Sequence, residues 1–461
     1  MSFFVVYFNC NKVREVINMK RSLKVFTLVF ALMFGLIIKV NALDVTNEST
    51  LKSCIETTGN TCKLTSDVVL NSDLIIEKDI EITLDLNGHS ITPVSTLSLS
   101  RGLISIIHGG TLIVNDSVGT GKIDAGENIY SAISVTKKGN VDISKTATLI
   151  VNGGTLKGNT AGINGSGNAD RVITSITING GTIKGTSSDS LGIFHPQDGY
   201  LEINGGTISG TTGIEMRAGT LVVTGGVIEG NGTTFSVTPN GSGSTTKGVG
   251  IAIAQHTTDK KIDVTITGGT IKGYKALNES NPQGNSNVEE DIALNIEGGT
   301  FEAINGGTVA VESENLKEFV SGGTFNSNVD STYLVTDIKV EKLNGSFVAK
   351  NYYLIYVDED IKNGTVTAVE KAYSGDLVKL DIKPDKGYKV SKIEVLDHLD
   401  RSIEVKDNSF TMPTSPVMIK VTFEKEEVVP NTGDGIITFI IIGLISLIAT
   451  GYAVNKLRKN A

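Results

Sequence analysis

In LEINGGTISG, residues 201–210, a short alternating apolar run stops at two adjacent glycines and then resumes. Close relatives of it recur along the chain: TLIVNGGTLKG, SITINGGTIKG, TLVVTGGVIEG and DVTITGGTIKG. Each unit has a short alternating strand, a polar residue, Gly-Gly and a second short strand that ends in Gly. The glycine pair is therefore either a ligand-binding loop or a corner of the backbone.

The spacing of the glycine pairs indicates an internal repeat. The pairs begin at Gly109, Gly153, Gly180, Gly205, Gly225, Gly268, Gly298, Gly306 and Gly322. If the two long gaps each hold two units, most repeats are about 20–30 residues long, which is the length of one coil of a β-solenoid. The short interval between Gly298 and Gly306 does not fit one pair per coil.

A third short strand follows several units and begins Gly-Ile, at Gly162, Gly192, Gly213 and Gly250. Three short strands per unit with tight corners predict a parallel β-helix of about ten or eleven coils, each adding about 4.8 Å to a rod. Alternate residues then point inward. Leu201 and Ile203 are expected to stack on Leu221 and Val223 of the next coil, and Ile208 on Ile228.

The glycine pairs are interpreted as corners. A corner needs backbone with positive φ, which Gly adopts without the Cβ penalty. Asn often precedes the pair and can form hydrogen-bonded ladders between coils, at Asn152, Asn179, Asn204 and Asn305. A phosphate loop would end in Gly-Lys-Ser/Thr, and the calcium-binding GGxGxD repeat needs an Asp. The units contain GGTIxG instead.

Two stretches carry a family resemblance: LDLNGHSIT (84–92) and LGIFHPQDGYLEINGGTISGTTGIEMRAGTLVVTGG (191–226). They resemble a widespread class of gut-bacterial surface proteins with a right-handed β-helix of the pectate-lyase-like type. The resemblance covers roughly residues 50–335. It implies the fold and a surface location, and it implies little about activity, because most members of that class have no assigned one.

The N-terminal region predicts a secretory signal. In MKRSLKVFTLVFALMFGLIIKVNALD a basic start precedes an apolar run, and small residues stand at 40 and 42. Cleavage is expected between Ala42 and Leu43, and Met19 is the expected true start. The alternative is an N-terminal membrane anchor, which this apolar run is short for.

The C-terminal region has three parts in order: a pentapeptide, an apolar run at 436–454 and a basic tail. The run is long enough to span a bilayer. The pentapeptide is Val429, Pro430, Asn431, Thr432 and Gly433. It resembles the LPxTG sorting signal of Gram-positive wall proteins, with Val in place of Leu. That resemblance implies cleavage between Thr and Gly by a sortase and transfer to a peptidoglycan precursor. The mature chain would span 43–432; the alternative is a tail-anchored protein.

Glycine pairs stop after Gly345, and a second module is predicted at 346–425 with turns at Asn363-Gly364, Ser374-Gly375 and Lys386-Gly387. PDKGYKV and FTMPTSPVMIKVTF resemble the bacterial repeat module related to internalin-type B-repeats. Such modules resemble stalk units; ligand binding is the alternative. The expected all-β chain thus has a signal peptide (1–42), a β-helix with an N-terminal cap (43–345), this module (346–425), a linker (426–435) and a transmembrane helix with a basic tail (436–461).

Charge and cysteine content limit the partners. The formal net charge of −9 argues against a nucleic-acid partner, which requires a basic face. Cys54 and Cys62 lie close together in an exported segment and are expected to form a disulfide, with two free thiols as the alternative. Cys10 belongs to the segment that is removed.

The search for a site yields no catalytic residues, no metal ligands and no cofactor. The five histidines lie in separate units, and His89 and His108 occupy corner-like positions. His195, in FHPQDG, is interpreted as a loop tip. Glu215 and Arg217 are interpreted as a surface ion pair. The acidic residues of the repeats are scattered, and the aromatic residues available for sugar stacking are Tyr130, Phe194, Tyr200, Phe235 and Tyr274.

These features favour a non-enzymatic, wall-anchored surface protein that binds host or microbial glycans or proteins. The first alternative is a polysaccharide lyase or hydrolase, because the parallel β-helix also hosts such enzymes; a groove with carboxylates and Arg together would favour it. The second alternative is a structural wall component.

Overall fold

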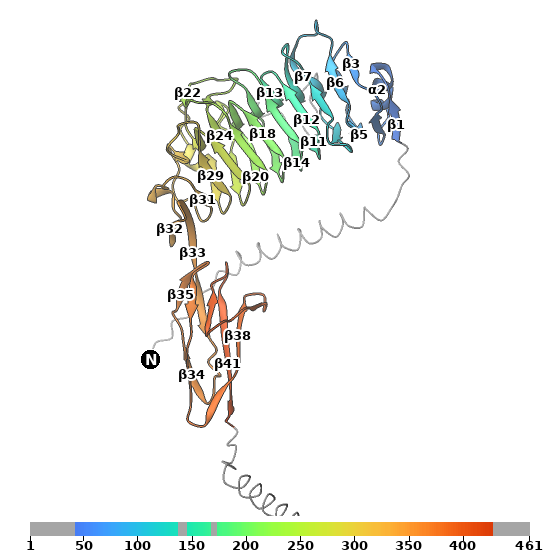
Figure 1. The fold of residues 1–461 in the computed structure, drawn as a ribbon. Helices are drawn as coiled ribbons and strands as arrows, with labels where there is room; N and C mark the ends of the chain where they lie inside the picture. Colours follow the sequence, from blue (N-terminus) through green and yellow to red (C-terminus); the bar gives the residue numbers. More distant parts are fainter. Residues whose placement is uncertain (1–41, 137–144, 167–172, 427–461) are drawn as a thin grey trace, which may run out of the picture. The chain divides into compact units, whose positions relative to one another are not determined.

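The computed structural model describes residues 42–136, 145–166 and 173–426. The chain divides into two compact units between Lys350 and Asn351. The first unit contains three long parallel sheets, visible in Figure 1 as successive strands from blue to gold. Consecutive strands along the chain belong to different sheets, and each pairs with its counterpart one coil later, which is the arrangement of a parallel β-helix.

The three sheets are named here by their order within a coil. The first sheet contains β1 Ala42–Val45, β2 Thr61–Leu64, β5 Glu81–Asp85, β8 Thr111–Asn115, β11 Ala147–Val151, β14 Thr174–Ile178, β17 Gly199–Ile203, β20 Gly219–Val223, β25 Ile262–Ile266 and β28 Ile292–Ile296. The second sheet contains β3 Val68–Leu70, β6 Ser90–Pro93, β9 Lys122–Asp124, β12 Thr155–Gly158, β15 Thr182–Gly185, β18 Thr207–Gly210, β21 Val227–Gly230, β26 Thr270–Gly273, β29 Thr300–Ala303 and β31 Thr324–Phe325. The third sheet contains β4 Leu74–Ile76, β7 Leu99–Ile106, β10 Ile129–Thr136, β13 Ala161–Ser166, β16 Leu191–His195, β19 Thr212–Met216, β24 Val249–Ile253, β27 Lys275–Glu279 and β30 Val311–Ser313.

The predicted stacking between coils is confirmed. Leu201 pairs with Leu221, and Ile203 with Val223, in the first sheet. Ile208 pairs with Ile228 in the second. All six side chains are fully buried. Because identical positions of successive coils lie directly over one another, the apolar rows form one continuous core along the unit.

The two glycines of a pair have different reasons for being glycine. Gly206 has φ +80°, where a side chain is strained. Gly205 has an ordinary φ, but a Cβ there would lie 2.5 Å from the carbonyl oxygen of Asn179 on the preceding coil. The pair is thus a corner in tight contact with the corner below it. Gly306 belongs to another kind of turn, after β29, and this explains its irregular spacing.

The asparagines before the corners form the expected ladder. The side-chain Nδ2 of Asn204 donates to Oδ1 of Asn179 (3.0 Å), and Asn179 donates to Asn152 (2.8 Å). Asn152 donates in turn to Asn115 (2.8 Å). Asn305 is the exception, because it follows β29 and donates to the carbonyl of Gly232 instead. In the ladder, the Asn side chain of each coil therefore finds a hydrogen-bond partner in the Asn side chain of the neighbouring coil.

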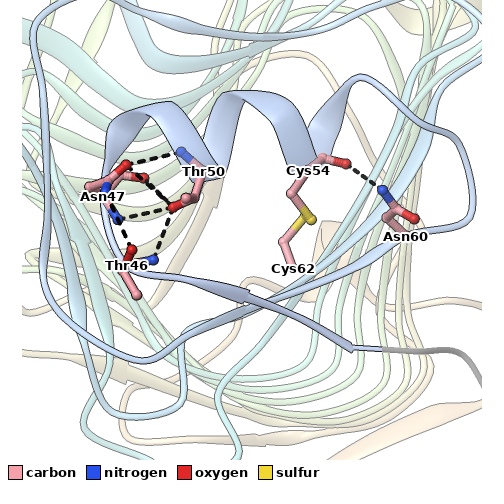
Figure 2. Close-up of a disulfide and its surroundings, with 6 residues drawn as sticks. All are labelled: Thr46, Asn47, Thr50, Cys54, Asn60 and Cys62. Carbon is pink, nitrogen blue, oxygen red and sulfur yellow. Dashed lines mark hydrogen bonds between the residues drawn. A yellow bond between two sulfur atoms is a disulfide. The ribbon is translucent and has the colours of Figure 1, made fainter.

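The helix α2 (Glu48–Ile55) lies beside the first strands and closes the N-terminal coil (Figure 2). Its N-cap is a capping box: Oδ1 of Asn47 accepts from the backbone N of Thr50, and the Thr50 hydroxyl accepts from the backbone N of Asn47. Cys54 at the end of the helix is bonded to Cys62 of β2. The Asn60 side chain donates to the carbonyl of Cys54 (2.8 Å) and fixes the intervening loop.

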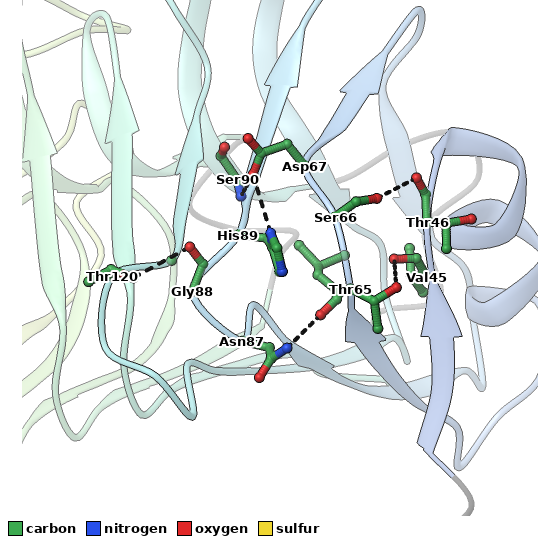
Figure 3. A network of polar contacts seen from close by, with 12 residues as sticks. Val45, Thr46, Thr65, Ser66, Asp67, Asn87, Gly88, His89, Ser90 and Thr120 are labelled. Atoms are coloured by element: carbon green, nitrogen blue, oxygen red, sulfur yellow. Dashed lines mark hydrogen bonds and ion pairs between the residues drawn. The ribbon is translucent and has the colours of Figure 1, made fainter.

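Polar contacts also join the first coils at their corners (Figure 3). The carboxylate of Asp67 accepts from the backbone N of Ser90 (2.8 Å), and this hydrogen bond lowers the pKa of Asp67. His89 lies beside the same carboxylate, with 3.6 Å between Nδ1 and Oδ1. Asn87 donates to the carbonyl of Leu64 on the preceding coil. His89 therefore contacts an acid of the neighbouring coil.

The remaining described elements lie at insertions and toward the C-terminus. Those of the first unit are β22 Ser236–Val237, β23 Thr246–Lys247, α3 Val288–Asp291, η1 Ser331–Tyr333 and β32 Ile338–Leu343. Strand β33 Ser346–Val357 runs across the division. The second unit adds β34 Gly364–Thr367, β35 Lys371–Tyr373, β36 Leu377–Lys379, β37 Asp381–Pro384, β38 Tyr388–Asp397, β39 Ser402–Ile403, β40 Ser409–Thr411 and β41 Val417–Lys425.

The second unit has its own apolar core. Its longest pairing is the antiparallel pair of β38 and β41, and β33 joins β41 in parallel. Phe410, Ile419 and Val395 are among its buried residues. The predicted turns are present: Asn363 has φ +67°, Gly375 +81° and Gly387 +85°.

Candidate functional site

The outward face of the third sheet differs from the outward faces of the other two. Strands of the first and second sheets alternate between buried and partly exposed residues, as in β20 and β21. By contrast, β16, β19 and β24 are buried at every position. Something must therefore cover the side of this sheet that faces away from the core.

Part of that cover is the segment 231–248, which is inserted between β21 and β24 and is called the cover segment below. It contains a short antiparallel hairpin in which Ser236 pairs with Lys247. The backbone of the cover segment is hydrogen-bonded to β19, because the Thr212 hydroxyl donates to the carbonyl of Thr246 (2.8 Å). The cover segment thus lies over β19 and excludes water from it.

Glu215 and Arg217 hold the cover segment, and both are fully buried. The Glu215 Oε1 accepts from the backbone N and from the hydroxyl of Thr245, both at 2.8 Å. The Arg217 guanidinium donates to the carbonyl of Asn240 at 2.8 Å and to that of Gly243. The interpretation of Glu215 and Arg217 as a surface ion pair is therefore wrong, because the insertion folds back over them.

Burial changes the proton affinity of both groups. Loss of water raises the pKa of Glu215 to about 7, although the hydrogen bonds from Thr245 and the charge of Arg217 act in the opposite direction. Loss of water also lowers the pKa of Arg217, against the attraction of Glu215. Glu215 is thus a carboxyl group that changes its charge near neutral pH.

Several polar atoms on this side of the unit lack a hydrogen-bond partner among the described residues. They are Asn164 Oδ1, Glu215 Oε2, Arg217 Nη2, Asn278 Oδ1 and Ser280 Oγ. The strand register places Asn164, Glu215 and Asn278 in one row across β13, β19 and β27, through Phe194 of β16 and Ala252 of β24. Buried polar groups normally find a partner, so such a row needs an explanation.

A groove of about 520 Å³ lies beside the cover segment. One wall is formed by the cover segment and another by β27 and the residues that follow it; β30 and η1 complete it. The lining residues are Phe235, Val237, Asn278, Glu279, Ser280, Asn281, Pro282, Glu312, Ser313, Glu314 and Tyr333. All of them belong to the first unit.

The groove is held by side chains whose own hydrogen bonds are satisfied. Glu279 is fully buried; its carboxylate accepts from the Ser313 hydroxyl (2.6 Å) and from the backbone and side chain of Asn315 (2.9 and 2.8 Å). The Tyr333 hydroxyl donates to the carbonyl of Ser313 (2.9 Å). These contacts fix the walls of the groove, which is the usual condition for a preformed ligand site.

Two other sequence-based interpretations are also wrong. His195 is the last residue of β16 and is fully buried, not at a loop tip. Its Nδ1 lies 3.1 Å from the carbonyl of Ala218, so this nitrogen carries the proton, and burial lowers the pKa of His195 to about 4. Phe194 is only 4% exposed and packs with Leu191 and Ala161, so it offers no open ring to a sugar.

The other aromatic candidates are dispersed, and only Phe235 lines the groove. Tyr200 is exposed on the first sheet. Burial raises the pKa of Tyr130, with a further contribution from the charge of Glu215. Asn278, Ser280 and Glu312 were not singled out from the sequence. Aligning the third strand of each repeat would have shown polar residues recurring at the position of Glu215.

The remaining predicted sites are largely beyond the described residues. Val429, Pro430, Asn431, Thr432, Gly433 and the apolar run at 436–454 lie outside the part of the chain that the structure describes. Ala42 and Leu43 form the start of β1. Within the described ranges, no helix is long and apolar enough to cross a membrane. In the same ranges, no three His, Cys, Asp or Glu residues are grouped to hold a metal ion.

The first unit defines the chain as a parallel β-helix protein with a covered, polar outward face. The second unit has a match: residues 359–427 fit the family model of the divergent InlB B-repeat domain. This confirms the resemblance to internalin-type repeats and fits a protein displayed at a surface. No curated protein and no solved structure matches the chain.

Proposed function

We propose that the chain is a non-enzymatic surface protein that is attached to a bacterial cell wall and binds glycans or proteins of other surfaces. The B-repeat match at 359–427 supports display at a surface. The signal-like N-terminus and the order of pentapeptide, apolar run and basic tail support export and wall attachment. In this proposal a sortase cleaves between Thr432 and Gly433 and transfers the chain to a peptidoglycan precursor.

The observation that carries the binding role is the groove beside the cover segment. Its walls are fixed by internal hydrogen bonds, and two buried side chains that line it, Asn278 and Ser280, have polar atoms without a partner in the part of the chain that the structure describes. An unpartnered buried polar atom costs about 1–3 kcal/mol of stability, and a fold that needed only to be a rod would gain by replacing it. The groove therefore fits a ligand site better than a spacer.

Wall attachment and binding are tested separately. Cells that express the full chain are digested with a wall hydrolase, and the mass of the released chain is measured; Thr432→Ala should leave it in the membrane fraction. The same cells are compared with cells lacking the chain for adhesion to mucin, glycan arrays and host-cell surfaces. Equal adhesion on every surface would reject the binding role.

One observation favours a second function, cleavage of a polysaccharide. A carboxyl group with a pKa near neutrality, such as Glu215 at about 7, suits general acid–base catalysis, and Arg217 lies close enough to affect its pKa. Both are sealed under the cover segment, so catalysis would require this segment to move. Incubating the full chain with neutral and acidic polysaccharides and measuring new chain ends tests the idea. No cleavage, or equal cleavage by Glu215→Gln, would exclude Glu215 as the acid.

A further inference from the structure

We propose that the groove beside the cover segment binds a neutral or amino-sugar saccharide and rejects acidic glycans. This inference deepens the proposed function and rests on it. Three properties of the groove support it: the sign of its charge, its excess of hydrogen-bond acceptors and its aromatic side chains.

The groove is negatively charged. Glu279, Glu312 and Glu314 line it, and no Lys, Arg or His is among the described residues that line it. Lys275, which does not line the groove, forms an ion pair with Glu312 and is mostly buried. A ligand with carboxylate or sulfate groups would place like charges together in a partly desolvated space, which is unfavourable. A polyuronate or a sialylated chain is therefore excluded by charge.

The groove offers acceptors and requires donors. A carboxylate can only accept hydrogen bonds, and the side chain of Glu312 remains 44% exposed toward solvent. Among the described residues, Asn278 Oδ1 is a further acceptor without a partner and Ser280 Oγ is a hydroxyl without one, and both atoms are themselves buried in the wall of the groove. Both residues are more than nine-tenths buried and line the groove. Sugar hydroxyls are numerous donors that also accept, and an amino group adds a charged donor, so either matches this set.

Two aromatic rings supply the apolar part of a sugar site. Tyr333 is fixed by its hydroxyl and by stacking on Phe319, with 4.9 Å between the ring centres. Phe235 is fixed by Lys275, whose Nζ lies 3.6 Å from the ring centre. Aromatic side chains beside polar groups provide apolar contact for the C–H faces of a sugar ring. The volume of about 520 Å³ accommodates a short segment of a glycan chain.

The test uses cells that display the full chain and fluorescent glycans of known charge: neutral oligosaccharides, chitosan-type amino oligosaccharides, polygalacturonate and sialylated oligosaccharides. Asn278→Leu removes the side-chain amide, whose Oδ1 has no partner among the described residues and whose Nδ2 donates to Glu312 over 3.5 Å. Glu312→Gln removes one charge. The matched controls are Asn164→Leu, in the same row but away from the groove, and Glu302→Gln, on β29 of the second sheet. Antibody against residues 351–426 measures display.

The expected result is binding of a neutral or amino glycan and none of the acidic ones. Asn278→Leu should weaken binding at least roughly tenfold, and Glu312→Gln should weaken binding of the amino glycan most. Both controls should bind like the wild type. Thermal unfolding of the purified full chain separates a role in the site from a role in the scaffold. Asn278→Leu should be as stable as the wild type or more so, because removal of the unpartnered Oδ1 outweighs loss of the long (3.5 Å) hydrogen bond from Nδ2 to Glu312.

Each contrary outcome has a distinct meaning. Binding of acidic glycans, or glycan binding that Asn278→Leu leaves unchanged, overturns the groove inference and leaves the proposed function standing. Binding of proteins alone does the same. Loss of binding together with a large loss of stability in Asn278→Leu shows that Asn278 supports the scaffold, and that also overturns the inference. Absence of any difference from cells lacking the chain, for glycans and proteins alike, rejects the proposed function itself.

Discussion

The ionisation of Glu215 and the ionisation of His195 should change the free energy of unfolding with pH in opposite directions. Both side chains are fully buried, on adjacent strands of the third sheet. Burial raises the pKa of Glu215 from 4.5 to about 7, so the folded protein holds this proton more tightly than the unfolded chain does. The contribution of protonated Glu215 to the free energy of unfolding is therefore fully present below about pH 4.5 and is lost as pH rises through about 7.

His195 acts in the opposite direction over nearly the same range. Burial lowers its pKa from 6.5 to about 4, so the folded protein holds this proton less tightly than the unfolded chain. The contribution of neutral His195 to the free energy of unfolding is fully present above about pH 6.5 and is lost as pH falls through about 4. Each shift is about 2.5 pKa units, which at 1.36 kcal/mol per unit corresponds to about 3 kcal/mol. The two contributions therefore nearly cancel between pH 4.5 and 6.5.

Single substitutions should expose each slope. In Glu215→Gln, the free energy of unfolding relative to the wild type should rise by about 3 kcal/mol between pH 4.5 and 8. In His195→Gln it should fall by about 3 kcal/mol from pH 4 to 7. Urea unfolding of the full chain, followed by far-ultraviolet circular dichroism at each pH, measures both differences, and a constant loss of stability in either variant does not alter its slope.

A variant whose free energy of unfolding follows pH in parallel with the wild type would contradict the burial of the substituted side chain. A parallel curve for Glu215→Gln would mean that water reaches Glu215 in the folded protein and that the cover segment does not seal it. A parallel curve for His195→Gln would mean that His195 is hydrated within the first unit. Either outcome would contradict the burial described above.

Three further predictions concern the scaffold. Leu201→Ala should destabilise the first unit by about 2–5 kcal/mol, because it leaves a cavity in a fully buried row; urea unfolding measures it, and a change below about 1 kcal/mol would contradict the stacking. Asn179→Ala removes two ladder hydrogen bonds and should cost about 1–2 kcal/mol, whereas Asn305→Ala, outside the ladder, should cost less. Reduction of the bond between Cys54 and Cys62 should cost about 2–3 kcal/mol and increase hydrogen exchange mainly in α2 and β2; exchange that rises evenly along the chain would show that the cap is not a local unit.

The coil-to-coil register could be read from the sequence because each repeat contains the same inward rows. A strand that slips by one residue would turn Leu201 and Ile203 outward, so the apolar alternation leaves one acceptable register. The glycine pairs mark corners for a related reason. Only glycine fits where Gly205 approaches the carbonyl of Asn179. Local pattern and global stacking agree here, and such agreement makes a fold predictable from sequence.

The candidate site was less predictable because it depends on an insertion. Most of the cover segment, TTFSVTPNGSGSTTK at 233–247, has the composition of a loop. Its sequence does not indicate which face of the β-helix it covers. Its position determines that Glu215 and Arg217 are buried, since its own backbone supplies their partners. Without knowledge of the cover segment, a Glu and an Arg two residues apart on a strand indicate a solvent-exposed ion pair.

The polar side chains of the corner ladder and those of the third sheet differ in how fully their hydrogen bonds are satisfied. At the corners that follow the strands of the first sheet, the side chains of Asn179 and Asn204 hydrogen-bond to each other along the ladder, as expected for a position that only has to be stable. On the third sheet the row through Glu215 and Asn278 leaves Glu215 Oε2 and Asn278 Oδ1 without partners among the described residues, and each such buried atom costs about 1–3 kcal/mol of stability. Asn164 belongs to that row without lining the groove. The variants Asn278→Leu and Asn164→Leu therefore distinguish the groove from the rest of the row. If both gain stability and only Asn278→Leu loses ligand binding, the groove is a binding site, and the other unpartnered atoms of the row result from the way this face is covered.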